Sequence, residues 1–196
     1  MLFTRKETPP RFLSYTAYKP HLRRDFLLRC AYCLIHEAHF GGLRNFHIDH
    51  FQPKGKFPDL TLEYANLYYS CSVCNTTKGE HWPSAEEATA GYCFADPCAV
   101  DPYQEHFGLD VDGELRPYTK VGKYTIEHLR LNRRQLVNHR QEQENALAQC
   151  RILRELLETC EIPESVFHKI REQLDQIEKY YADPSAPYES ADLLPT

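Results

Sequence analysis

The architecture of this chain follows from three short segments: CAYC at residues 30–33, HIDHFQP at residues 47–53 and YANLYYSCSVCNTTKG at residues 64–79. They contain two C-x-x-C pairs, formed by Cys30, Cys33, Cys71 and Cys74. Four thiolates can close a tetrahedral zinc site, and because such a site keeps no open coordination position, its role is structural. The same ligands also suit an iron–sulfur cluster, and buried free thiols are a third interpretation. We prefer zinc, since nothing else in the sequence suggests redox chemistry.

The segment between the two pairs, HIDHFQP, has the pattern of a short strand that Pro53 ends. On a strand, His47 and Asp49 would share one face. Asp49 and His50 stand at the end of this strand, and Asn75 directly follows the second cysteine pair. A carboxylate and an amide oxygen suit a hard cation such as Mg²⁺, and a neighbouring histidine can take a proton from water. The spacing therefore predicts one small site formed by these residues.

Together these motifs resemble the HNH endonucleases, also called His-Me finger or ββα-metal nucleases. The resemblance covers about residues 28–82 and implies a zinc-stapled finger of two strands and a helix. Asparagine occupies the last position of the HNH triplet, so this is an HNN variant. The roles that the resemblance implies are a catalytic Mg²⁺ or Mn²⁺ held by Asp49 and Asn75, a general base at His50, a brace at Asn66 and a phosphate contact at Lys78.

Two points stay open at this stage. His47 fits a third metal ligand, a group that supports a ligand, a phosphate contact or a purely structural residue. The cysteines would also fit a non-catalytic, zinc-stabilised module that binds nucleic acid or protein. Such a module has no need of Asp49, His50 and Asn75, so we prefer the nuclease.

The segment after the finger resembles one HNH subfamily more specifically. It reads FADPCAVDPYQEHFGLDVDGELRP at residues 94–117, and Leu131-Asn132-Arg133 follows on a predicted helix. This subfamily includes the HNH effectors of Septu and retron anti-phage systems, which work beside an SMC/ABC-like ATPase. The resemblance implies a defence nuclease with such an ATPase partner. DNA is the expected substrate, and RNA, including tRNA, is the alternative.

Composition excludes several other classes of protein. The chain has 196 residues, of which 42% are hydrophobic and 26% charged, close to ordinary globular proteins. No apolar run reaches the roughly 18 residues of a membrane-spanning helix, so no membrane association is expected. The first residues, MLFTRKETPPRF, lack the apolar core of a signal peptide. A cytoplasmic location is therefore expected.

Charge is unevenly distributed around a formal net charge of −5. Residues 1–44 carry eight Lys and Arg against three Asp and Glu, whereas residues 141–196 carry five against twelve. The basic segment could lie on phosphate, and Arg23 and Arg24 are its expected contacts. Solvated surface charge is the alternative for each of them. The acidic C-terminal part is expected to avoid nucleic acid and to offer a surface to a partner.

The predicted fold class is α+β, a small finger with a mainly helical C-terminal lobe. Asp112-Gly113 predicts a hairpin over residues 107–118, and apolar periodicity predicts helices over 123–137, over 141–160 and from Pro163 onward. Cys150 and Cys160 are expected to be small buried hydrophobic residues. The predicted segments are a basic N-terminus at 1–27, the nuclease core at 28–82, an irregular part with the hairpin at 83–122, a helical lobe at 123–182 and a tail at 183–196.

Overall fold

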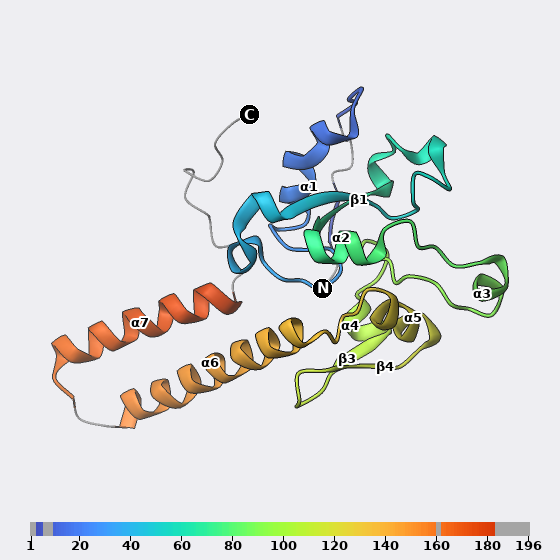
Figure 1. Ribbon diagram of the computed structural model, residues 1–196. Helices are drawn as coiled ribbons and strands as arrows, with labels where there is room; N and C mark the ends of the chain where they lie inside the picture. Colours follow the sequence, from blue (N-terminus) through green and yellow to red (C-terminus); the bar gives the residue numbers. More distant parts are fainter. Residues whose placement is uncertain (1–2, 6–9, 160–161, 183–196) are drawn as a thin grey trace. The chain divides into compact units, whose positions relative to one another are not determined.

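The computed structural model describes residues 3–5, 10–159 and 162–182. The chain divides into two compact units, Met1–Val137 and Asn138–Thr196. Helices accompany two small antiparallel sheets of two strands each, which confirms the α+β class (Figure 1). Within the described ranges, no helix is both long enough and apolar enough to cross a bilayer.

The centre of the first unit is a strand pair followed by a helix. Strand β1 (Phe46–His50) pairs with β2 (Leu67–Cys71), and α2 (Ser72–Lys78) starts at the next residue and lies beside β1 (Figure 1). The antiparallel register places Asp49 opposite Tyr68. Gly79 ends the helix in a conformation with φ of 48°, which glycine adopts readily. The predicted two strands and short helix are therefore confirmed.

Aromatic side chains form the core around this motif. All five residues of β2 are buried, because the strand is covered on both faces. The Phe46 and Tyr69 rings stack with their centroids 4.8 Å apart, and Phe26 packs on Tyr68 at 5.5 Å. Phe26 directly follows α1 (Lys19–Asp25), which contacts β2. Since aromatic rings bury large areas and pack in defined geometries, this core fixes the position of the strand end.

Two arginines of the basic N-terminal segment point into the protein. Arg5 donates to the backbone oxygens of Tyr64 and Leu67 at 2.9 and 2.7 Å. Arg23, only 5% exposed, donates through Nε to both carboxylate oxygens of Glu37 at 3.0 and 2.9 Å. A buried cation needs such a partner to offset its lost hydration. Arg23 is therefore buried and paired with Glu37, which does not fit the phosphate contact expected of it.

The remaining elements of this unit are short. The predicted hairpin is present as β3 (Phe107–Leu109) and β4 (Leu115–Pro117), with Gly113 at φ of 79° in its turn. The other elements are α3 (Ala85–Thr89), α4 (Pro102–Glu105), α5 (Lys120–His128) and 3-10 helices at Tyr15–Tyr18, Glu37–Phe40, Gly42–Asn45, Pro58–Leu60 and Tyr64–Asn66. Helices α3 and α4 lie in a stretch that the sequence predicts to be irregular.

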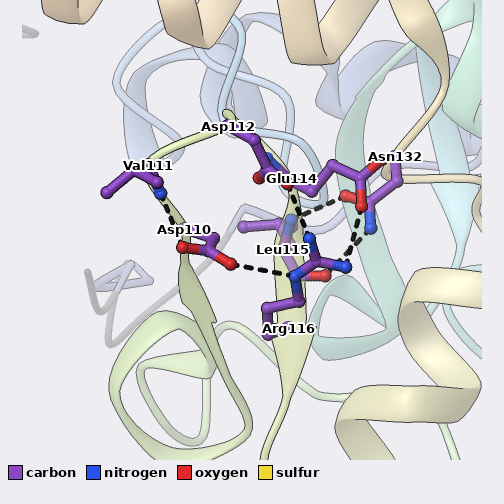
Figure 2. Close-up of polar contacts among 7 residues, drawn as sticks. All are labelled: Asp110, Val111, Asp112, Glu114, Leu115, Arg116 and Asn132. Carbon is purple, nitrogen blue, oxygen red and sulfur yellow. Dashed lines mark hydrogen bonds and ion pairs between the residues drawn. The ribbon is translucent and has the colours of Figure 1, made fainter.

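The helix predicted over residues 123–137 is interrupted. Helix α5 ends at His128, and Arg130 has φ of 47°, a left-handed conformation that breaks the helix. Asn132 then accepts from the N–H of Leu115 at 2.8 Å and donates to its carbonyl at 2.9 Å (Figure 2). On the same hairpin, Arg116 pairs with Asp110 at 3.1 Å (Figure 2). Because the helix is interrupted here, the Asn132 side chain can bond both backbone groups of Leu115 and so attach the hairpin to this segment.

The second unit contains α7 (Glu164–Ala182) and most of α6 (Arg134–Thr159). These two helices lie side by side (Figure 1), and Arg154 joins them through hydrogen bonds of 2.8 Å to both carboxylate oxygens of Glu178. Cys150 is buried at 2% exposure, which confirms its expected role as a small hydrophobic residue. Cys160 and the predicted tail at 183–196 lie outside the described residues.

Candidate active site and zinc site

The four predicted cysteines form one buried cluster. Their sulfur atoms all lie within 4.8 Å of one another, and the Cys33 and Cys71 sulfurs are 3.9 Å apart. With Zn–S bonds of about 2.3 Å, the edge of a sulfur tetrahedron is about 3.8 Å. The donor set and its spacing therefore fit zinc.

Local backbone geometry brings the two cysteine pairs together. Cys71 is the N-cap of α2, and its sulfur accepts the N–H of Cys74 at 3.4 Å. In the first pair, the N–H of Ala31 donates to the carbonyl of Tyr69 at 2.8 Å, which attaches this turn to β2. Leu34 at φ of 60° closes the turn. The cluster therefore links residues 30–33 to the strand and helix that also carry the predicted active site.

Arg133 is a neighbour of this cluster that the sequence analysis missed. Its Nη2 atom lies 3.4 Å from the Cys74 sulfur and 4.0 Å from the Cys71 sulfur. The thiolates raise the pKa of Arg133 although burial acts in the opposite direction. A zinc ion bound by four thiolates keeps a net negative charge, and this guanidinium is placed to compensate part of it. The Leu131-Asn132-Arg133 pattern was its only signal in the sequence.

A cavity of about 440 Å³ lies where β1 ends beside the first turn of α2. His47, Asp49, His50 and Asn75 all line it. His47 is exposed, Asn75 is half-buried and the other two are buried. The structure therefore brings the four predicted residues to one cavity, and the carboxylate is among the buried residues of its lining.

Asp49 is held by two partners. The hydroxyl of Tyr32 donates to its Oδ2 atom, and the Lys78 ammonium lies 3.0 Å from the same oxygen and 3.3 Å from Oδ1. Burial raises the pKa of Asp49 to about 6, against the opposing effect of Lys78 and Tyr32. At neutral pH the carboxylate is therefore mainly ionised, which is the form that binds a cation.

Lys78 occupies a different place from the one expected of a phosphate contact. Lys78 is 1% exposed, and its ammonium also donates to the backbone oxygen of His50 at 2.7 Å. The hydrogen bonds of this buried ammonium thus go to the end of β1. The expected contact with a phosphate does not fit this position, and the lysine instead fixes Asp49 and the backbone of His50.

His50 has the arrangement of a base. Its Nε2 atom is 3.1 Å from the carbonyl oxygen of Thr61. Because a carbonyl can only accept, Nε2 carries the proton, and in the neutral ring Nδ1 has a free lone pair. Burial lowers the pKa of His50, as do nearby lysines, against the raising effect of the Thr61 carbonyl. The ring is therefore neutral at physiological pH and able to accept a proton.

Asn66 lies behind the site. Its Oδ1 accepts the N–H of Gln52 at 2.8 Å, and its Nδ2 donates to the carbonyls of Gln52 and Leu60 at 3.0 and 3.3 Å. These bonds close the loop that carries Thr61. This is the geometry of a brace, because all three bonds go to the backbone. Arg24, the remaining predicted phosphate contact, is exposed on α1 with its guanidinium 3.1 Å from Nδ1 of His21.

The strand pair, the following helix and the two sites together define an HNH-type domain. Residues 30–81 match the family model of the HNH endonucleases, so the family resemblance of this segment is confirmed. The chain is 29% identical over 121 residues to the Septu protein PtuB of Bacillus thuringiensis. That alignment covers 58% of this chain and 42% of that protein, so the chain matches less than half the length of this relative.

Proposed function

We propose that this chain is a metal-dependent endonuclease that hydrolyses phosphodiester bonds, with DNA as its first substrate. The main observation behind this proposal is that Asp49, His50 and Asn75 line one cavity. The Thr61 carbonyl keeps the His50 proton on Nε2, which leaves Nδ1 able to act as a base. A carboxylate, an amide and an oriented imidazole are what hydrolysis with one cation requires. The match of residues 30–81 to the HNH endonucleases supports the same reaction class.

Asp49 and Asn75 would hold the catalytic Mg²⁺ or Mn²⁺. The bound ion supplies Lewis acidity toward the scissile phosphate and the leaving oxygen. Both side chains offer oxygen donors, which hard cations prefer. Tyr32 and Lys78 keep the Asp49 carboxylate in one orientation, and the cation would use the lone pairs of its oxygens that these two donors leave.

His50 takes the proton of the attacking water on Nδ1. The resulting imidazolium keeps its Nε2–H bond to the Thr61 carbonyl, which stabilises the charged ring. The Lys78 ammonium fixes the backbone of His50 by donating to its carbonyl oxygen. The ring is thereby held in place by contacts that do not occupy the atom that reacts.

We propose structural zinc for the four-cysteine cluster. The cluster is closed and buried, so it has no room for substrate. An iron–sulfur cluster is distinguished by its visible absorption and by iron in metal analysis of the purified protein. The expected result is one zinc ion for each chain and no visible chromophore.

The biological role we propose is that of nuclease effector in a bacterial anti-phage system, in the cytoplasm, beside an SMC/ABC-like ATPase. The support is the similarity to a Septu protein and the resemblance of the segment after residue 94 to Septu and retron effectors. The second unit has exposed apolar side chains, among them Ile152 at 58% and Leu156 at 49%. Such a surface is available for a protein partner.

The test is a cleavage assay on plasmid DNA, single-stranded DNA and total RNA, with Mg²⁺, Mn²⁺ or EDTA. It is run with and without a candidate SMC/ABC-like ATPase as the proposed partner. The proposal expects cutting of DNA that EDTA abolishes and that a His50→Ala variant lacks. Cutting of RNA alone would establish the RNA nuclease. A folded, zinc-loaded protein that binds nucleic acid but cuts nothing in any combination would establish the non-catalytic module.

A further inference from the structure

Part of the cavity wall comes from outside the segment that matches the HNH family. Tyr15, Thr16 and Lys19 line the same cavity as His50, although all three precede residue 30. Tyr15 starts the 3-10 helix Tyr15–Tyr18, whose N-cap Ser14 accepts the N–H of Thr16. The N-terminal segment is therefore folded against the candidate active site.

Tyr15 contacts two residues of that site. Its ring meets the His50 imidazole at a centroid distance of 4.9 Å and an interplanar angle of 72°, an edge-to-face contact. The ammonium of Lys54 lies 5.2 Å from the centroid of the same ring, within the range of a cation–π contact. One aromatic ring thus touches both the general base and a loop lysine.

Lys54 is the cation that the cavity offers to a substrate. It is exposed on the loop after β1 and lines the cavity. Lys78 is buried against Asp49, and Lys19 donates its ammonium to the carbonyl of Leu43 at 3.1 Å. Lys56, two residues after Lys54, is also exposed but donates to the carbonyl of Trp82 at 3.4 Å. Lys54 thus differs from these three lysines, whose ammonium groups bond to a carboxylate or a backbone carbonyl.

We propose that Lys54 binds a phosphate of the nucleic-acid substrate at this cavity, and that Tyr15 is the positioning residue that holds both Lys54 and the His50 ring. The inference rests on the proposed nuclease function. It assigns the N-terminal segment to the active site rather than to a separate basic surface. A phosphate contact of this kind carries no base specificity and lowers KM for all sequences alike.

The first experiment compares Lys54→Met with the matched control Lys56→Met in the full chain. Binding of a labelled 20-base-pair duplex is measured by fluorescence anisotropy over a series of salt concentrations, and cleavage is measured with Mg²⁺. Lys54→Met is expected to raise Kd and KM roughly tenfold and to reduce the salt slope by about 1, with kcat nearly unchanged. Lys56→Met is expected to change none of these values. Equal behaviour of the two variants would overturn the phosphate contact.

The second experiment compares Tyr15→Phe with Tyr15→Ala. Phenylalanine keeps the ring that touches His50 and Lys54, so its kcat and KM should equal those of the wild type. Alanine removes both contacts, so kcat should fall and KM should rise, each by roughly threefold to tenfold. A merely structural role would lower Tm without changing KM or the salt slope, and that result would overturn the positioning role. If the wild type binds but never cuts, the nuclease proposal fails while the anisotropy comparison still decides the role of Lys54.

Discussion

The cysteine cluster and the cavity use the same strand and helix in opposite ways. The cluster has four identical ligands, all buried and all directed at one point. The cavity has one buried carboxylate, one fixed imidazole and one half-buried amide, and it is open to a substrate. A closed site contributes folding free energy, whereas an open one keeps coordination positions for chemistry. Sites only one residue apart, at Cys74 and Asn75, can therefore have separate functions.

Two residues connect the cysteine cluster to the cavity. Asn75 follows Cys74 directly on α2, and Tyr32 lies inside the first cysteine pair while its hydroxyl donates to Asp49. We therefore expect loss of the cluster to disturb the cavity residues, and loss of a cavity residue to leave the cluster intact. The variants below test this asymmetry.

Cys71→Ser has the largest expected effect. The substitution removes a zinc ligand, and zinc binding in such sites is worth about 10–16 kcal/mol in isolated zinc-finger peptides, so the finger should lose zinc, its cooperative melting and its activity together. Zinc content by mass spectrometry and melting by circular dichroism measure this. Cys93→Ser is the control, because Cys93 stands outside the four-cysteine cluster. A Cys71→Ser protein with wild-type zinc and Tm would contradict a four-thiolate site.

His50→Ala affects the cavity alone. It removes the base but no cluster ligand, so zinc content and Tm should stay close to those of the wild type. Cleavage should fall by roughly 10²–10⁴, the range for loss of a general base. His168→Ala is the control, because His168 is exposed on α7 and is not among the residues that line the cavity. If His50→Ala fails to fold, the histidine is structural, and if it cuts at the wild-type rate, the mechanism is wrong.

Asn75→Ala is expected to have a smaller and reversible effect. It weakens the site for the catalytic ion without removing the base, so cleavage at low Mg²⁺ should fall by roughly a hundredfold. High Mn²⁺ should restore part of it, since Mn²⁺ binds oxygen sites more tightly than Mg²⁺. A titration of rate against each ion measures this. A loss that no concentration of Mn²⁺ relieves would mean that Asn75 does not hold the ion.

The contrast between the sites also explains what could be predicted from the sequence. The cluster and the strand were predictable, because C-x-x-C spacing and a short extended run ended by a proline are local patterns, and so was the Asp112-Gly113 turn. The roles of Lys78, Arg23 and Arg133 were not. Each lysine or arginine looks like a surface charge in its own segment, and its burial follows from a partner far along the chain. Only the folded structure brings those charges together.

At saturating Mg²⁺, which keeps the Asp49 carboxylate ionised, the pH dependence of cleavage should follow His50. Since burial lowers its pKa below the ordinary value of 6.5, the base is neutral and active over a wider range toward acid. Below the lowered pKa, the ring is protonated and the rate should fall about tenfold per pH unit. A profile of kcat/KM from pH 4.5 to 8 measures the midpoint. An acid limb with its midpoint above 6.5 would contradict the assignment of His50 as the base.

Tyr32→Phe has the smallest expected effect and tests the connection between the cysteine cluster and the cavity. The substitution removes the hydroxyl that donates to Asp49 but keeps the ring, which stacks on Tyr68 at 6.1 Å. Losing one hydrogen bond to a charged group should weaken Mn²⁺ binding roughly tenfold, measured by electron paramagnetic resonance, and raise the Mg²⁺ requirement for cleavage equally. Zinc content should not change.

Tyr68→Phe is the matched control, because it removes a similar hydrogen bond, from Tyr68 to Asp96 at 2.6 Å, away from the cavity. It should lower Tm while leaving Mn²⁺ affinity unchanged. If Tyr32→Phe instead behaves like this control, the cysteine cluster supports the cavity only through the backbone. If Tyr32→Phe lowers Mn²⁺ affinity at constant zinc content, the segment of the first cysteine pair holds the Asp49 carboxylate directly through the Tyr32 hydroxyl. Both variants lose one tyrosine hydroxyl, but only the hydroxyl of Tyr32 donates to Asp49, so the difference in Mn²⁺ affinity reports that hydrogen bond.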